Sequence, residues 1–179
     1  MRISTLLLFL TFLAFSTSAF AKLNEDDIKT YLHDSSNLIN TAKNTSPEAV
    51  SDFLSLHLSD AFRFVDYAKV RLNGKDVAQP TRIFKDAYIE NVLSNLTQIS
   101  EYTPELDVKL IKISDDQLTG SAKYRLKTNA LIQNTDPQLQ PNKINTDSQC
   151  TELFEFNEGT NTLRSTKLTC SSKIIFSSN

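Results

Sequence analysis

Two acidic residues and one tyrosine have the spacing that acid–base chemistry inside a folded protein would require. Asp66 has the same strand parity as Phe64, so both would point to one face of a strand. Glu152 has the parity of Phe154, and Tyr124 falls in the apolar row of a third strand-like stretch. A carboxyl group in apolar surroundings has a raised pKa, which suits a general base beside a carbonyl group with a tyrosine as hydrogen-bond donor. The alternative is that both acids lie at strand ends, where they are solvated or paired with a cation.

The histidines, glycines and short motifs offer little for metal or cofactor chemistry. His33 and His57 are the only histidines, and their separation of 24 residues matches no zinc-binding helix motif. The sequence has no G-x-S-x-G, P-loop or dinucleotide-binding fingerprint, and it contains only 3 glycines. We therefore expect no metal and no cofactor. His57 flanks an apolar helical stripe, so it either reaches the mouth of a cavity or packs as an ordinary surface histidine.

The two cysteines predict a disulfide across a hairpin. Cys150 and Cys170 lie symmetrically about Thr160, in a turn-like stretch, so residues whose numbers sum to 320 would face each other. The cysteine face then carries Phe154, Phe156 and Leu168, and the opposite face carries Thr151, Glu155, Ser165, Lys167 and Thr169. We predict a structural disulfide, although a slip of one residue in the register would spoil the pairing.

The first 21 residues have the layout of a secretory signal peptide. Arg2 provides a positive start, residues 6–15 are almost entirely apolar, and Ala19-Phe20-Ala21 forms a small-x-small cleavage site before Lys22. The apolar run is too short to span a bilayer. We expect a soluble periplasmic or secreted protein with no transmembrane helix in its mature chain. Residues 22–179 would form a single domain.

The charge balance sets limits on the partners. Removing the signal segment with Arg2 leaves 18 basic and 21 acidic residues, a net charge of −3. Bulk charge therefore gives no reason to expect a nucleic-acid partner. A basic row on one sheet face is predicted from Lys109, Lys112, Lys123, Arg125 and Lys127. It would dock an acidic partner or a membrane surface, or it is simply the solvated face of the sheet.

The order of elements predicts an α+β domain. Helical spacing and caps predict helices over residues 24–43, from Ser46 to Leu58, and after Pro80 up to about Ile99. Strands are expected at 62–69, 107–114, 118–132 and in the cysteine hairpin, with a turn at Asn73-Gly74-Lys75. Residues 134–149 are predicted to be a long polar loop. Sequential strands with short turns favour a curved antiparallel sheet with the helices on its apolar face.

Three segments carry a resemblance to a known superfamily. Residues 53–64, the Asn73-Gly74-Lys75 turn and residues 154–163 resemble the SnoaL-like branch of the nuclear transport factor 2-like superfamily. The resemblance implies a cone, in which a curved sheet wraps around helices and encloses a pocket. Strand parity then names the pocket-lining residues, which are Phe62, Phe64, Tyr124, Leu126, Phe154 and Phe156. In this superfamily the outer sheet face often pairs subunits, so the resemblance also implies a possible homodimer through the sheet.

We expect an exported, non-catalytic binding module that holds a small apolar ligand or a protein partner. The first alternative is a SnoaL-like isomerase, cyclase or hydratase, with Asp66 or Glu152 as base and Tyr124 as hydrogen-bond donor. The second is an accessory subunit of an envelope or secretion assembly.

Overall fold

The computed structural model describes residues 22–44, 46–72, 75–133 and 142–178 and confirms the α+β class. The helices are α1 (Glu25–Ser36), α2 (Leu38–Asn44), α3 (Pro47–His57) and α4 (Lys85–Leu96). The strands are β1 (Leu58–Leu72), β2 (Lys75–Phe84), β3 (Ile99–Ile113), β4 (Thr119–Ile132), β5 (Asn142–Asn157) and β6 (Thr162–Ser178). The predicted signal segment, residues 1–21, lies outside the described residues. Among the described helices, none combines the length and apolar character needed to cross a bilayer.

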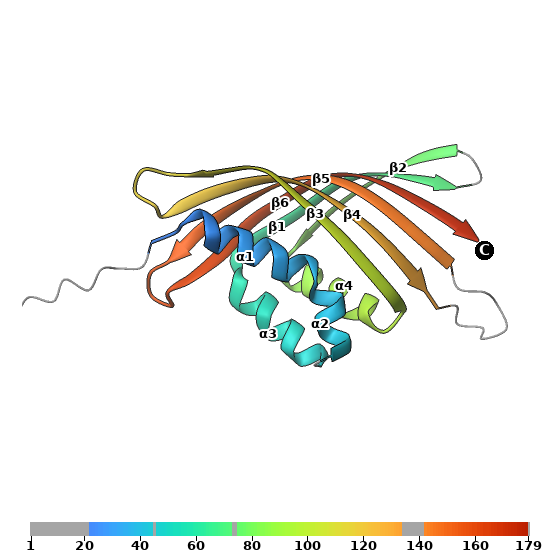
Figure 1. The fold of residues 1–179 in the computed structure, drawn as a ribbon, viewed down its shortest axis with the longest axis horizontal. Coiled ribbons are helices and arrows are strands. Elements are labelled where there is room, and N and C mark those ends of the chain that lie inside the picture. The colour runs from blue at the N-terminus through green and yellow to red at the C-terminus, as the bar shows by residue number, and fades with distance from the viewer. Residues whose placement is uncertain (1–21, 45, 73–74, 134–141, 179) are drawn as a thin grey trace, which may run out of the picture.

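The strands form one curved sheet, and all four helices lie against its concave side (Figure 1). The strand order is β2-β1-β6-β5-β4-β3. Every neighbouring pair is antiparallel except β1 and β6, which run parallel. The prediction of a wholly antiparallel sheet was therefore wrong at this pair. Parallel neighbours need a long crossover, and the chain from β2 to β5 provides it.

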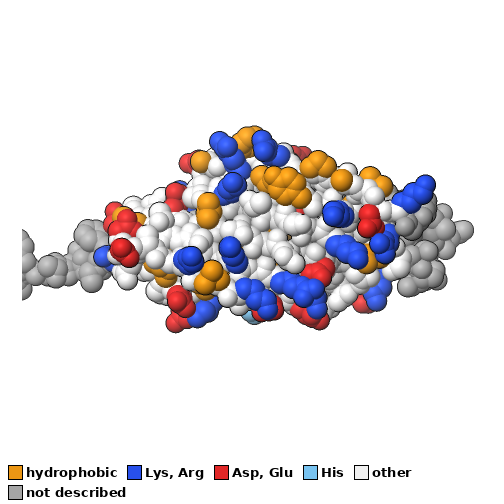
Figure 2. All heavy atoms as spheres, turned by 90° about the horizontal axis from the view of Figure 1, so that it is seen from above, with side chains coloured by type: hydrophobic (Ala, Val, Ile, Leu, Met, Phe, Trp, Pro, Cys, Tyr) orange, Lys and Arg blue, Asp and Glu red, His pale blue; other side chains and the backbone are white. Residues whose placement is uncertain are grey.

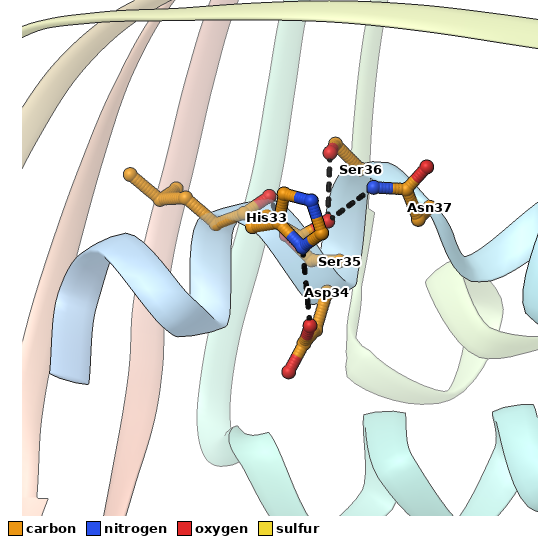
Figure 3. Close-up of polar contacts among 6 residues, drawn as sticks. His33, Asp34, Ser35, Ser36 and Asn37 are labelled. Atoms are coloured by element: carbon orange, nitrogen blue, oxygen red, sulfur yellow. Dashed lines mark hydrogen bonds and ion pairs between the residues drawn. The ribbon is translucent and has the colours of Figure 1, made fainter. Parts of the chain in front are cut away.

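The first predicted helix divides into α1 and α2 at Asn37. Asn24 caps α1, since its side chain accepts a hydrogen bond from the Asp27 backbone N–H. At the other end, Ser36 Oγ and Asn37 Nδ2 donate to the His33 carbonyl oxygen at 2.8 and 2.9 Å (Figure 3). Polar side chains that bond to backbone carbonyls in this way compete with helix continuation, which explains the break.

Two other predicted boundaries were wrong. Pro80 does not open a helix but lies in β2, an edge strand that tolerates a residue without a backbone N–H, and the helix starts at Lys85. The loop predicted at 134–149 is shorter, because β5 begins at Asn142. Residues 134–141 of that loop, and Asn73 and Gly74 of the predicted turn, lie outside the described residues.

The β5–β6 hairpin confirms the disulfide and corrects the register near the turn. Cys150 is opposite Cys170 and bonded to it, as the sum of 320 predicts. After Leu153 the register shifts by one residue, so that Phe154 faces Ser165 and Phe156 faces Leu163. This irregularity places Ser165 on the inner face, fully buried at 0% exposure, and not on the polar face as predicted.

The core fills the space between the helices and the concave side of the sheet. Ile28 and Leu32 of α1 pack on one part of the sheet, and Leu54 of α3 packs with Phe62 on the other. Gly120 permits the close approach of α1, because a Cβ atom there would lie only 3.1 Å from Ile28 Cδ1. The helix α1 therefore lies close to the sheet, next to the buried Glu152.

Candidate functional site

A buried carboxylate with two tyrosine hydroxyls forms the most distinctive polar group inside the molecule. Glu152 of β5 is 2% exposed. Its Oε1 accepts a hydrogen bond from the hydroxyl of Tyr31 on α1 at 3.1 Å, and its Oε2 accepts one from Tyr124 on β4 at 2.9 Å. The group therefore ties the first helix to two neighbouring strands. We call it the Glu152 cluster.

Burial dominates the electrostatics of the Glu152 cluster. Desolvation raises the pKa of the Glu152 carboxyl, and the hydroxyls of Ser165, Tyr124 and Tyr31 oppose that shift only in part. The pKa values of Tyr31 and Tyr124 are raised well above their ordinary value by burial and by the nearby carboxylate. Both tyrosines therefore keep their protons and act as donors. Ser165 Oγ is buried beside the same carboxylate, but no described atom meets it in good hydrogen-bonding geometry.

The Glu152 cluster forms the polar wall of a small internal cavity of about 80 Å³. The rest of the lining is mostly apolar and comes from both layers of the fold: Tyr31, Leu32, Ser35, Ser36, Leu38, Leu54, Leu58, Phe62, Tyr88, Leu106, Tyr124, Leu126, Glu152 and Leu168. Ser35 and Ser36 stand where α1 ends (Figure 3). Drug-sized ligands occupy pockets of about 300–1,000 Å³, so this cavity suits a much smaller molecule.

The structure brings the predicted pocket residues into one interior, but not all of them reach the cavity. Phe62, Tyr124 and Leu126 line it. Phe154 is buried against the Tyr31 ring at 5.5 Å, and Phe64 packs on Tyr88 at 5.3 Å. Phe156 lines an open groove instead.

Sequence reasoning missed Tyr31 and Tyr88 as cavity residues. Both belong to apolar helical stripes, and the phenolic oxygen within such a stripe was the available signal. A buried tyrosine hydroxyl usually needs a hydrogen-bond partner, and for Tyr31 that partner is Glu152.

Asp66 is not part of the Glu152 cluster. It lies on β1, and one row across the concave face reads Asp66, Cys170, Cys150 and Tyr124, so the disulfide stands between Asp66 and Tyr124. Asp66 Oδ1 accepts a hydrogen bond from Ser172 Oγ at 2.9 Å. Partial burial raises the pKa of Asp66, and that hydrogen bond opposes the shift. Asp66 and Glu152, the two alternative bases predicted from the sequence, therefore lie in different surroundings, and Glu152 is the one bonded to Tyr124.

His57 lies in the open groove, which has a volume of about 600 Å³ and lies between α1, α3 and the β5–β6 turn. Its Nδ1 is 2.9 Å from the Leu163 carbonyl oxygen, and since a carbonyl only accepts, Nδ1 carries the proton in the neutral ring. The His57 ring packs on Phe53 and Tyr31 at centroid distances of 4.6 and 5.7 Å. Tyr31 lines both the groove and the cavity.

His33 is remote from these contacts. It lies near the end of α1 with its Nδ1 3.4 Å from Asp34 Oδ1 (Figure 3). Over the described ranges of the chain, no set of three or more His, Cys, Asp or Glu side chains is grouped to hold a metal ion.

The convex side of the sheet, which we call the outer face, carries many basic side chains spread among polar and hydrophobic ones (Figure 2). By strand register it carries Arg63, Lys69, Arg71, Arg82, Lys109, Lys112, Lys123, Arg125, Lys127, Lys143, Arg164, Lys167 and Lys173. The acidic residues of the same face are Asp76, Glu101, Glu105, Asp107, Asp147 and Glu155. The predicted basic row is thus part of a larger surface.

Comparison with known proteins defines the fold. The structure resembles a conserved protein from Planctomyces limnophilus, with a TM-score of 0.58 at 10% sequence identity, covering 87% of this chain and 97% of that one. It also resembles a candidate aromatic ring hydroxylase from Novosphingobium aromaticivorans, with a TM-score of 0.58 at 13% identity and coverage of 86% and 91%. A candidate scytalone dehydratase from the same species gives a TM-score of 0.54 at 10% identity, with 86% of each chain covered.

These similarities, at 10–13% sequence identity, show that the chain shares its overall fold with these proteins. No protein-family model and no curated protein sequence matches the chain.

Proposed function

We propose that this protein is a binding module that holds a small, mainly apolar molecule with one polar group inside its cone. The observation that carries the proposal is the Glu152 cluster at the wall of an otherwise apolar cavity. Apolar side chains provide most of the affinity in such sites, and a few fixed polar groups set the orientation. Export through a signal peptide remains an expectation from the first 21 residues.

Two features favour binding over catalysis. Both oxygens of Glu152 already accept hydrogen bonds, from Tyr31 and from Tyr124. The cavity of about 80 Å³ accommodates only a few heavy atoms beside them. A larger ligand would need the side chains that line the cavity to move.

Native mass spectrometry of the protein purified from its own compartment tests the proposal. We expect the wild-type protein to carry a small molecule that Leu126→Phe, which fills the cavity, and Glu152→Gln, which removes the carboxylate, both lose or hold more weakly. Asp66→Asn, outside the cavity, is the matched control and should retain it. A wild-type protein found without any bound molecule would contradict the proposal.

Acid–base catalysis is the second candidate. The observation that favours it is a carboxyl group of raised pKa in direct contact with the Tyr124 hydroxyl. A Glu152 carboxylate would take a proton from the carbon beside a carbonyl, and Tyr124 would turn its hydroxyl to the carbonyl oxygen. The fold is shared with a candidate scytalone dehydratase and a candidate aromatic ring hydroxylase, which supports keeping an enzymatic role in view.

The two candidates differ in a measurable way. Catalysis predicts that the protein exchanges the α protons of a small ketone such as acetone with deuterium from D2O, and that Glu152→Gln abolishes this exchange while the fold persists. A binding module gives the same slow exchange in both proteins.

A further inference from the structure

Basic residues are concentrated on one side of this molecule, although its net charge is slightly negative. The outer face carries thirteen of the 19 Lys and Arg residues and only six of the 21 Asp and Glu residues. The helical layer has the opposite character, with Glu25, Asp26 and Asp27 in the first turn of α1 alone. A face that is merely solvated mixes both signs, so this separation needs another explanation.

Internal ion pairs neutralise only part of the outer face. Arg125 pairs with Asp147, Lys109 pairs with Asp107, and Arg71 pairs with Asp76 at 2.8 Å. Lys123, Lys127 and Lys173 form no such ion pair within the described part of the chain. Lys127 of β4 and Lys173 of β6 lie on either side of Asp147 of β5, the partner of Arg125, and Lys123 lies four residues away along β4.

Large apolar side chains lie exposed among these cations. Tyr67 is 57% exposed, Phe84 is 58% exposed and Leu153 is 41% exposed. Register places all three on the outer face, where they face Pro80, Arg63 and Lys167 of the neighbouring strands. Cations interspersed with exposed aromatic and aliphatic side chains are typical of surfaces that bind the interface of anionic membranes.

We propose that the outer face binds the surface of a lipid bilayer rich in anionic headgroups, with Lys123, Lys127 and Lys173 in the contact. The cations meet the headgroups, and the exposed apolar side chains enter the interfacial layer. A second copy of the chain is a poorer partner for this face, since two such surfaces would bring like charges together. A nucleic acid would satisfy the cations but would leave Leu153 exposed. This proposal does not depend on the ligand in the cavity.

Co-sedimentation with vesicles tests it. Vesicles made of equal parts of phosphatidylglycerol and phosphatidylcholine should bind the wild-type protein at least roughly tenfold more tightly than vesicles of phosphatidylcholine alone. Binding should weaken with added salt, because salt screens the cations from the headgroups. Equal binding to the two vesicles, or no binding to either, would overturn the proposal.

A pair of charge-matched variants separates the outer face from net charge. K123E/K127E/K173E reverses three outer cations, and K22E/K29E/K43E reverses three lysines at the helical side by the same total charge. Each basic residue near an anionic surface contributes about fivefold to partitioning, so the loss of three should weaken binding of the first variant roughly a hundredfold, and the second should stay within about twofold of wild type.

An equal loss in both variants would overturn the assignment to this face. Tighter binding to duplex DNA than to the anionic vesicles at the same salt concentration would identify a nucleic acid as the partner instead. Unchanged thermal unfolding midpoints establish that both variants are folded.

Discussion

Glu152 and Asp66 are two acids on the same concave face whose surroundings differ. Burial raises the pKa of both carboxyl groups. Glu152 is fully enclosed, holds two tyrosine hydroxyls and borders a cavity. Asp66 is only partly buried and is held by Ser172, whose hydroxyl in turn contacts Ser148 at 2.8 Å.

The surroundings of the two acids differ because they lie at different positions in the sheet, although both point to its concave face. Both residues satisfy the alternation that predicts an inward side chain. Glu152 lies where α1 covers the sheet and can supply Tyr31. Asp66 faces Thr81 and Cys170 across the sheet, and its side-chain partner is Ser172. Glu152 is therefore the better candidate for a functional role, because α1 covers it and supplies a hydrogen-bonding tyrosine.

The largest expected difference between the two acids is in stability. Glu152→Ala removes the shared partner of two buried tyrosine hydroxyls, and each unsatisfied buried group costs about 1–3 kcal/mol, so we expect a loss of about 4 kcal/mol in the free energy of unfolding. Asp66→Ala should cost only about 1 kcal/mol, because its single serine partner can turn to other groups. Urea unfolding of both variants measures this difference.

Glu152→Gln is the control for that comparison. It keeps an acceptor oxygen and nearly the same volume, so its cost should fall well below that of Glu152→Ala. Equal losses for Glu152→Ala and Asp66→Ala would show that the two sites are energetically alike.

The disulfide between the two sites should contribute slightly less to the free energy of unfolding than the Glu152 side chain does. Cys150–Cys170 closes a segment with a sequence separation of 20 residues, and a cross-link of this kind contributes about 2–4 kcal/mol, mainly by restricting the unfolded chain. The C150A/C170A variant should therefore unfold at a lower denaturant concentration by that amount. Identical midpoints for the oxidised and reduced wild-type protein would refute this expectation.

The alternation of side chains along each strand predicted which sheet face a residue points to. The prediction failed where strand register or pairing departed from the expected pattern. Alternation placed Glu152, Tyr124 and the disulfide correctly on the concave face. It misplaced Ser165, because a register shift after Leu153 cannot be seen in the spacing of the hairpin residues. The parallel pairing of β1 with β6 was equally hidden, since it joins strands that are distant in the sequence.

Only part of the candidate site could be predicted from the sequence, namely Glu152 and Tyr124 but not Tyr31. Glu152 and Tyr124 share a sheet face, so parity could bring them together. Tyr31 comes from a helix, and the pattern of a helix shows which side is buried without showing what that side meets across the core. Parity could not tell whether Asp66 or Glu152 would lie beside Tyr124, because a shared face does not fix the distance between two strands.

The pH dependence of stability should also separate the two acids. A carboxyl group whose pKa is raised in the folded state keeps its proton where the unfolded chain has lost it, so its contribution to stability falls as pH rises from about 4.3, the ordinary value for glutamate, to the folded pKa. Relative to Glu152→Gln, the wild-type protein should therefore become progressively less stable across that window and level off above it.

The same experiment with Asp66→Asn should give a shift of the same sign but of smaller size, because solvent screens a partly exposed carboxyl group. Urea unfolding at intervals from about pH 4 to about pH 8 provides the data. A wild-type protein that gains stability with rising pH relative to Glu152→Gln would show that the two tyrosines outweigh burial at this site.

The smallest effect concerns Ser172, whose hydroxyl donates a hydrogen bond to Asp66. Ser172→Ala should cost less than about 1 kcal/mol in the free energy of unfolding, because the bond is only partly buried.

Since the Ser172 hydrogen bond lowers the pKa of Asp66, its removal should raise that pKa further, and Tyr124→Phe should raise the pKa of Glu152 in the same way. Carboxyl carbon NMR titration of each variant measures both shifts. The tyrosine bond lies in the drier site, so its loss should move Glu152 more than the serine bond moves Asp66. A larger shift at Asp66 would reverse the order of the two sites and make the serine-held acid the better candidate for chemistry.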